Sequence, residues 1–331
     1  MSTAETIKGT KLETKRRPLV VDTFIRLIRE KPLGTAGGII LIIWIVIAVF
    51  ANFITPYDLD YMSLRDRLAP PSAQYLLGTD NLGRDLLSRI IFGARTSIIV
   101  GVAGTAIATL VALLIGVISG YSGKKVDIII QRFVDGIMCF PPLLLLITII
   151  SMIGTGLIKI TLVLGVVYGI AGSRVIRSAV IGIKSNIYVD AGKSIGASSS
   201  RIMLQHIIPN IMAPTIVLFT VRMGTVILAE ASLSFLGYGV PPPLPSWGGM
   251  LSGAGIQYML QAPFMAFWPG LALSSVVYGI NVLGDAVRDV LDPKLKGGAS
   301  RYSGVKVKEP KDGGNRQNDY NRVQNHIKEG K

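Results

Sequence analysis

The chain has 331 residues, of which 50% are hydrophobic and only 16% carry a charged side chain. An average soluble domain has about 25% charged residues, so this composition excludes a wholly soluble protein. The single cysteine, Cys139, excludes an internal disulfide framework and a cysteine-rich metal site. With only two histidines, His206 and His326, a histidine-rich metal site is not expected either.

Six apolar stretches are long enough to cross a membrane, since about 20 apolar helical residues span a hydrocarbon core of about 30 Å. The sequence therefore predicts an all-α, polytopic membrane protein with six transmembrane helices. No cleavable signal peptide is expected, because the first apolar stretch follows a polar, basic segment and is long enough to span. The predicted spans are Leu33–Ile54, Ser97–Gly120, Gly136–Ile153, Thr155–Ser173, Pro214–Tyr238 and Pro263–Gly284.

The basic residues favour one orientation of these spans. Lys and Arg number 34 against 20 Asp and Glu, a formal net charge of +14. With the N-terminus inside, the inner segments hold 27 Lys and Arg and the outer segments hold 6. Because cytoplasmic loops carry such an excess, we expect a multi-pass protein of the inner or plasma membrane with both termini cytoplasmic. Orientation then accounts for the charge, and no nucleic-acid partner is expected.

Three regions follow from this pattern. Residues 1–32 form a cytoplasmic N-terminal segment, and residues 33–298 form the transmembrane domain, which includes a cytoplasmic loop of about residues 178–212. Residues 299–331 are polar and poor in large apolar side chains. Such a composition cannot bury enough surface to fold alone, so we expect a disordered cytoplasmic tail.

The 178–212 loop predicts a helix–turn–helix. Gly196 can adopt the positive φ that ends a helix, and a serine among Ser198–Ser200 can cap a second helix. On that second helix a mostly apolar stripe would be available to a partner, and Pro209 would end the helix. A loop lying on the membrane surface is the alternative. The stripe consists of Ile202, Met203, His206 and Ile207.

This loop resembles the EAA loop of ABC-importer permease subunits, a Glu-Ala-Ala pattern followed at fixed spacing by Gly and by Ile-x-Leu-Pro. The spacing is intact, with Asp for Glu, Gly for the second Ala, His for Ile and Ile for Leu. The resemblance implies that the loop docks on an ATPase subunit. The matching positions are Asp190, Ala191, Gly192, Gly196, His206, Ile208 and Pro209.

Three further segments, in the same order along the chain, resemble the second, C-type permease of dipeptide/oligopeptide ABC importers, in the peptide/nickel transporter family. They are Gly78–Asp85 with Gly93–Ser97, Leu233–Gly248, and Asn281–Pro293. The resemblance implies the type I ABC importer permease fold. It also implies a second related permease, two ABC ATPase subunits, an extracytoplasmic binding protein and a peptide substrate. Nickel, glutathione and opine importers share these motifs and remain open.

The chain offers no nucleotide site of its own. A phosphate loop needs Gly, four residues, and then Gly-Lys-Ser/Thr after a buried strand. Gly192-Lys193-Ser194 matches only the end of that pattern, because Ile187 replaces the first glycine. We therefore expect no enzyme activity and no cofactor on this chain, with ATP and Mg²⁺ bound by the partner ATPases.

Two ionisable residues, Arg222 and Glu230, lie within the fifth predicted span. Such groups usually face a bundle interior or water. Their eight-residue separation places them about 12 Å apart along a helix, which is too far for a direct ion pair. They would line the pathway, with Arg222 attracting a peptide carboxylate, or form structural salt bridges to the partner permease.

The sequence also predicts the positions and partners of a few other polar and aromatic residues. Asp135 would pair with Arg132 at the inner membrane surface. Trp247 and Tyr258, in an uncharged outer loop, would lie at the interface. That loop would form part of the outer gate, meet the binding protein or pack on the membrane surface. Gly78–Asp85 lacks the ligand spacing of a calcium loop, so turn and helix-cap chemistry explains it better.

Two other function classes compete with an ABC permease. A secondary transporter usually shows internal repeats and ionisable clusters near the membrane midplane, and no repeat or further cluster is evident here. Uptake that is insensitive to ATP depletion but abolished by an uncoupler would favour that class. A membrane-embedded enzyme would need a nucleophile with a nearby base, and the predicted spans contain none.

Overall fold

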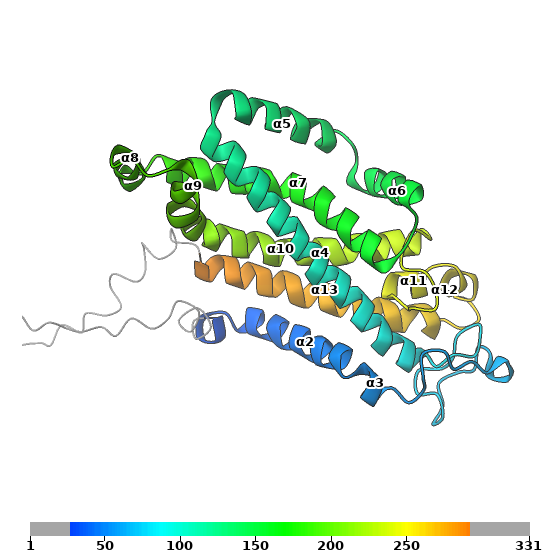
Figure 1. Cartoon of the computed structure of the whole chain (residues 1–331). Helices are drawn as coiled ribbons and strands as arrows, with labels where there is room; N and C mark the ends of the chain where they lie inside the picture. Colours follow the sequence, from blue (N-terminus) through cyan, green and yellow to red (C-terminus); the bar gives the residue numbers. More distant parts are fainter. Residues whose placement is uncertain (1–26, 292–331) are drawn as a thin grey trace, which may run out of the picture. The chain divides into compact units, whose positions relative to one another are not determined.

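The computed structural model describes residues 27–291, and every regular element in that range is helical (Figure 1). The predictions for residues 1–26 and for the tail at 299–331 lie outside the described residues. Five helices are long and apolar enough to cross a membrane. They are α2 (Pro32–Val49), α4 (Leu86–Ser122), α7 (Leu157–Lys184), α10 (Met212–Phe235), which continues the helical path from Ser199, and α13 (Phe264–Leu291).

The predicted third span is wrong as a single helix. The chain instead forms α5 (Lys124–Met138) and α6 (Pro142–Ile153), which meet at an angle of 88°. Pro141 and Pro142 supply no backbone N–H, and each disfavours helix at the residue before it. The apolar stretch therefore breaks there. The protein has six crossings only if this bent pair counts as one.

Helix α4 begins at Leu86, well before the predicted start at Ser97. Asp85 caps it, because its Oδ2 accepts a hydrogen bond from the Ser88 amide at 2.7 Å. With 37 residues, the helix is about 55 Å long and exceeds the hydrocarbon thickness. The first span also differs, because it breaks at Phe50 into α2 and the short α3 (Ala51–Ile54).

Glycines allow α4 and α7 to pack closely. A Cβ added at Gly169 of α7 would lie 2.6 Å from the Cβ of Val111, and one at Gly116 of α4 would lie 2.7 Å from the Cβ of Ile176. Real side chains do not approach so closely. Small residues at the contact let the two backbones come together, as they do in other membrane helix pairs.

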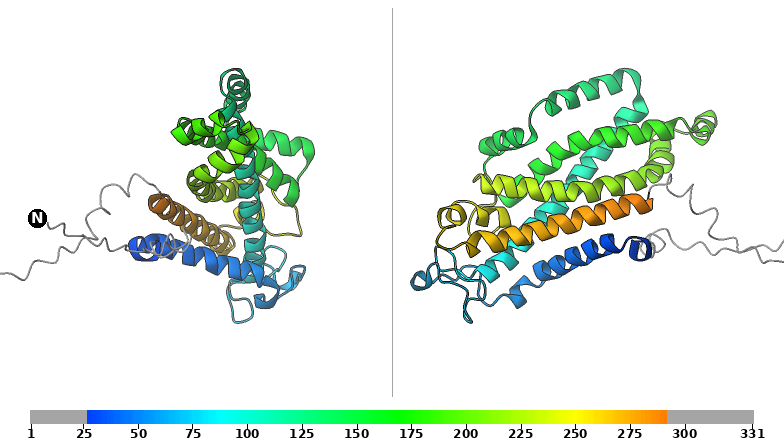
Figure 2. Two further views of the ribbon diagram at one scale, coloured as in Figure 1. Left: turned by 60° about the vertical axis from the view of Figure 1, so that its left-hand side comes forward. Right: turned by 180° about the vertical axis from the view of Figure 1, so that it is seen from behind.

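Helices α2 and α13 lie side by side and antiparallel (Figure 2). The Lys31 ammonium, just before α2, pairs with the Asp289 carboxylate near the end of α13 at 2.6 Å. The same end of the bundle carries α8 (Ile187–Ser194) and α9 (Ser199–Ile202), while the loop before α4 lies at the opposite end (Figure 1).

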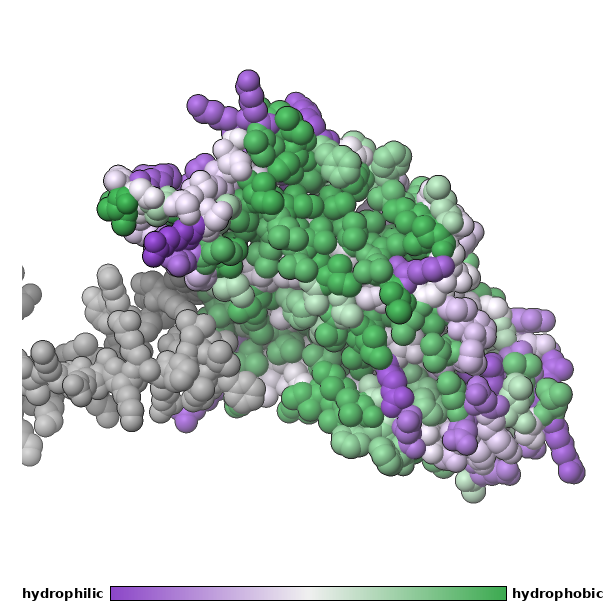
Figure 3. Space-filling model, in the orientation of Figure 1, coloured by the Kyte–Doolittle hydropathy of each residue, from purple (hydrophilic) through white to green (hydrophobic). Residues whose placement is uncertain are grey.

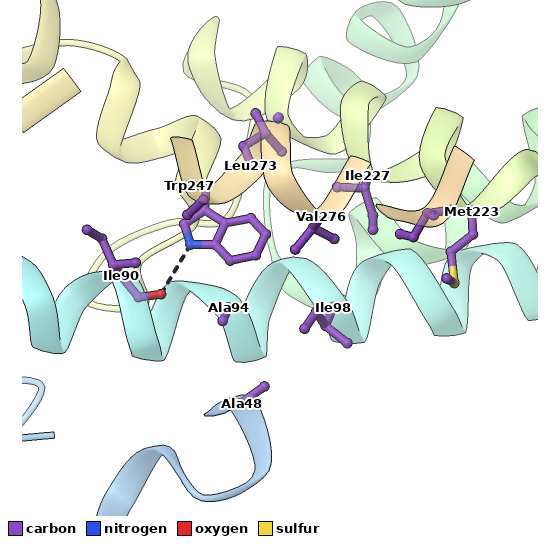
Figure 4. Close-up of a cluster of buried hydrophobic side chains, with 12 residues drawn as sticks. Ala48, Ile90, Ala94, Ile98, Met223, Ile227, Trp247, Leu273 and Val276 are labelled. Atoms are coloured by element: carbon purple, nitrogen blue, oxygen red, sulfur yellow. Dashed lines mark hydrogen bonds between the residues drawn. The ribbon is translucent and has the colours of Figure 1, made fainter. Parts of the chain in front are cut away.

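Trp247 centres the largest apolar cluster, and it is fully buried. Its indole N–H donates to the Ile90 carbonyl at 3.1 Å (Figure 4), and Trp44 packs edge-on with ring centroids 5.1 Å apart. The expectation that Trp247 lies at the membrane interface is therefore wrong. The helix that it begins, α11 (Trp247–Leu251), instead folds back between α4 and α13.

Apolar side chains cover the bundle between two more polar ends (Figure 3). Leu110 and Leu114 of α4 are both more than half exposed. An apolar surface of this extent is typical of helices that face lipid.

Candidate functional site

The 178–212 loop forms the helix–turn–helix that its sequence predicts. Helix α8 ends at Ser194, and Gly196 follows with φ of +81°. The Gly196 amide donates to the Lys193 carbonyl and the Ala197 amide donates to the Gly192 carbonyl, which is the Schellman pattern. The Ser198 hydroxyl then caps α9 by accepting from the Arg201 amide at 3.3 Å.

Pro209 does not end the second helix, contrary to the prediction. After α9 the backbone continues as a π turn at Met203–Ile207 and a 3₁₀ turn at Ile208–Ile211, and then as α10. These two turns change the backbone hydrogen-bonding pattern around proline, which has no N–H to donate. The second half of the loop is therefore in helical continuity with a membrane span.

The predicted apolar stripe faces the wrong way for a partner. Ile202 and Ile207 are fully buried in a cluster with α4 and α7, and Met203 packs against that cluster. The apolar side chains that point away from the bundle are different ones. Ile187 is 88% exposed, Ile195 is 85% exposed and Leu204 is 64% exposed. Ile187 and Ile195 lie at the two ends of α8, and nothing in the sequence pattern distinguished them.

The matched positions have varied surroundings. Four are exposed: Asp190, which pairs with Lys193 at 2.8 Å, Ala191, Gly196 and Pro209. Ile208 is half-buried against the inner cluster. His206 is half-buried, and its ring lies 6.3 Å from that of Tyr188.

Gly192 is buried, yet a Cβ added there would meet no atom of the described residues within 4 Å. Gly192-Lys193-Ser194 lies in α8 itself. It is not the strand-to-helix loop that a phosphate site requires.

The structure does not bring Arg222 and Glu230 together. The Arg222 guanidinium lies 5.8 Å from the centre of the Tyr168 ring of α7, and within residues 27–291 it forms no ion pair. Glu230 is fully buried. Its carboxylate accepts from the Ser234 hydroxyl at 2.6 Å and from the Ser97 hydroxyl of α4 at 3.4 Å.

Ion pairs fasten α5 to α7. The Asp127 carboxylate accepts from the Arg177 guanidinium at 2.6 Å, and Asp135 pairs with Arg174. The expected pairing of Asp135 with Arg132 is wrong, because the neighbouring helix supplies a nearer cation. The polar side of α5 thus faces its own bundle, while Ile129 and Phe133 are exposed.

Turn and cap chemistry is confirmed for Gly78–Asp85. The Asp80 Oδ1 accepts from the amides of Leu82 and Arg84, at 2.8 Å and 3.0 Å, and Asp85 caps α4. The loop before this segment is also internally bonded. Asp66 accepts from the hydroxyls of Ser63 and Tyr75, and these hydrogen bonds lower the pKa of the Asp66 carboxyl.

The comparisons with known proteins agree with this architecture. Residues 112–297 match the family described as binding-protein-dependent transport system inner membrane component, and residues 21–71 match the N-terminal TM domain of oligopeptide transport permease C.

Among curated relatives, the dipeptide transport system permease protein DppC of Alkalihalophilus pseudofirmus is 38% identical over 81% of this chain and 88% of its own length. The oligopeptide transport system permease protein OppC of Bacillus subtilis is 37% identical over 86% and 93%. The glutathione transport system permease protein GsiD of Escherichia coli is 38% identical over 83% and 90%.

The family model matches more than half of the chain, and the relatives are matched over most of their length. These matches identify the family. The chain belongs to the family of binding-protein-dependent transport system inner membrane components, the multi-pass permease subunits of ABC importers, whose systems also contain ATPase subunits and a substrate-binding protein.

Proposed function

We propose that this chain forms half of the translocation pathway of an inner-membrane ABC importer for di- and oligopeptides, paired with a second, related permease. Relatives named for dipeptide and oligopeptide transport, each matched over most of its length, support the substrate class. The excess of basic residues on the predicted inner segments supports cytoplasmic termini. Membrane lipid surrounds the apolar helices.

The 178–212 loop is proposed to carry the coupling to an ATPase subunit, which binds the ATP and Mg²⁺. The observation that carries this proposal is the exposure of Ile187 and Ile195 at the polar end of the bundle, on a short helix that Val189 anchors to the inner apolar cluster. An exposed apolar pair on a short helix fits a groove in a partner. Because the loop continues into α10, a movement of α8 would be transmitted to a membrane span.

Arg222 is proposed to face the pathway and attract the carboxylate of a peptide. Its guanidinium is half-buried and has no carboxylate partner among the residues described, and Tyr168 supplies only an aromatic face. A charge inside a membrane needs a counter-charge or water. A salt bridge to the second permease is the competing role. Glu230 is a weaker pathway candidate, since its hydrogen bonds lie within the bundle.

A glutathione importer is the nearest alternative, because glutathione permeases match this chain as well as dipeptide permeases do. Nickel and opine importers remain further alternatives from the shared motifs. A secondary transporter would not require the exposed α8 surface.

The test is uptake by the complete transporter reconstituted in proteoliposomes, with the binding protein outside and ATP enclosed. We expect a labelled dipeptide to accumulate only with enclosed ATP, and unlabelled glutathione or Ni²⁺ to compete weakly. Strong competition by glutathione would reassign the substrate. Dipeptide accumulation without ATP that an uncoupler abolishes would overturn the proposal.

A further inference from the structure

Next to the Gly78–Asp85 turn, one buried arginine has fewer hydrogen-bond acceptors than its guanidinium can use. Asp80 is the nearest carboxylate, and its side chain is only 6% exposed. Its Oδ1 accepts two backbone amides and its Oδ2 accepts from the Arg84 Nε at 2.7 Å. The acceptor capacity of Asp80 is thus largely used before a second arginine reaches it.

That second arginine is Arg89, in the first turns of α4. Its side chain is 12% exposed, and its Nε lies 3.5 Å from the Asp80 Oδ2. Its Nη1 is buried with no hydrogen-bond partner anywhere in residues 27–291. A buried donor that is left unpaired destabilises the fold, and a charged donor does so more than a neutral one. Such a group in a folded protein therefore calls for an acceptor that completes it.

Arg89 and Arg84 line a cavity of about 140 Å³. Asn81 and the backbone around Gly253 form other parts of its wall. Asp85 is the other buried carboxylate nearby, but it is engaged at the cap of α4 and lies within 4.0 Å of neither guanidinium. Two cations therefore face the cavity with one shared anion.

The size of the cavity limits what could fill it. Sites for whole small-molecule ligands measure about 300–1,000 Å³, so this cavity suits a single group and not a peptide. The fork of guanidinium donors matches a carboxylate or a phosphate, and a carboxylate is the anion that the side chains of a protein partner supply. The Gly78–Asp85 turn and α11, which supply lining residues of the cavity, lie at the end of the bundle opposite α8 (Figure 1). The proposed function places that end outside the cell.

We propose that this cavity receives one aspartate or glutamate side chain of the extracytoplasmic binding protein, which pairs with Arg89 and Arg84. The pairing gives the two arginines a second carboxylate beside Asp80 and fixes the docked orientation of the binding protein. This inference rests on the proposed function, since it needs the loop before α4 to lie on the extracytoplasmic side.

The test measures the affinity of the purified binding protein for the complete transporter in nanodiscs. Removing one partner of a buried charge pair leaves the other charge buried and unpaired, so Arg89→Gln should weaken binding at least about tenfold. Arg89→Lys, which keeps the charge without the fork, should lose less. Arg65→Gln is the matched control, because Arg65 is an exposed arginine on the same loop without an ion pair in the described chain.

Thermal unfolding of each variant shows whether the fold survives. If Arg89→Gln does not fold, neutralising the acidic residues of the binding protein one at a time gives the same test. One of them should have a clearly smaller effect in the Arg89→Lys background, because lysine keeps the charge but not the guanidinium fork. Unchanged affinity of a folded Arg89→Gln complex, or no acidic residue that couples to Arg89, would show that the cavity holds water only and overturn the inference. Absence of any binding by the wild-type transporter would instead count against the proposed function.

Discussion

The glycines of the α4–α7 contact have surroundings unlike those of the glycines in the 178–212 loop. At Gly116 and Gly169 an added Cβ would collide with the neighbouring helix. At Gly192 and Gly196 it would meet nothing within 4 Å in the described part of the chain. The first pair is explained by packing inside this chain. The second pair needs another reason.

For Gly196 that reason is its backbone. A φ of +81° is strained for residues with a side chain, and the turn places α8 relative to α9. For Gly192 neither packing nor backbone gives a reason, and the proposed reason is close approach of the ATPase subunit. The comparison separates glycines that build the bundle from glycines that serve the proposed coupling.

The largest effect is expected at the turn. Gly196→Pro cannot adopt the positive φ and loses the hydrogen bond to the Lys193 carbonyl. We expect it to abolish peptide uptake and to uncouple ATP hydrolysis, while membrane insertion stays intact. Gly196→Asn is the control, because asparagine tolerates this conformation, and it should retain most uptake. Normal uptake by the proline variant would contradict the coupling role.

Replacing two glycines of α7 with alanine should change the free energy of unfolding in opposite directions. Gly169→Ala would force its Cβ against α4, and overpacking of this kind costs about 1–3 kcal/mol. At Gly172, one turn away, a Cβ finds ordinary contacts of 3.4 Å or more. Gly172→Ala should therefore stabilise the helix by up to about 1 kcal/mol. Thermal unfolding in detergent measures both, and equal shifts would show that α4 and α7 are not so closely packed.

Gly192→Leu should have a partner-dependent effect. The isolated permease should unfold at or slightly above the wild-type temperature, since an added Cβ meets no atom of the described residues within 4 Å and leucine favours helix over glycine. Binding of the ATPase should weaken by about 1–3 kcal/mol, the usual range for overpacking. Titration of the purified ATPase against permease nanodiscs gives the affinity. Wild-type affinity would mean that Gly192 lies away from the contact.

The smallest effect is expected in the loop before α4. There the hydrogen bonds of a carboxylate, and not close packing at glycine, stabilise the local structure. Hydrogen bonds from Ser63 and Tyr75 lower the pKa of Asp66, so its ionised form stabilises the folded loop. That contribution is complete above the unfolded pKa of about 3.9 and is lost as the pH falls through the lower folded value. The tyrosine fluorescence of the loop should change below pH 4, and Asp66→Asn should remove that acid transition.

The turn and the helix cap were predictable from the sequence, but which side chains are buried between helices was not. Gly196 and Asp85 act within a few residues of themselves, so the turn and the cap followed from residue type. Trp247 and the Ile202–Ile207 stripe depend on which helices lie beside them, and amphipathic pattern alone does not specify the neighbour. The break at Pro141–Pro142 carried a readable signal, two prolines inside an apolar stretch, which hydropathy alone overlooks.

Crosslinking from α8 tests the central claim most directly. In a Cys139→Ser background, cysteine at Ile195, which is 85% exposed, should crosslink to the ATPase subunit in native membranes. Cysteine at Leu260, which is 96% exposed near the opposite end of the bundle, should react with an impermeant maleimide from outside and give no such product. Labelling of Ile195→Cys from the exterior, or no ATPase crosslink from either end of α8, would contradict the account.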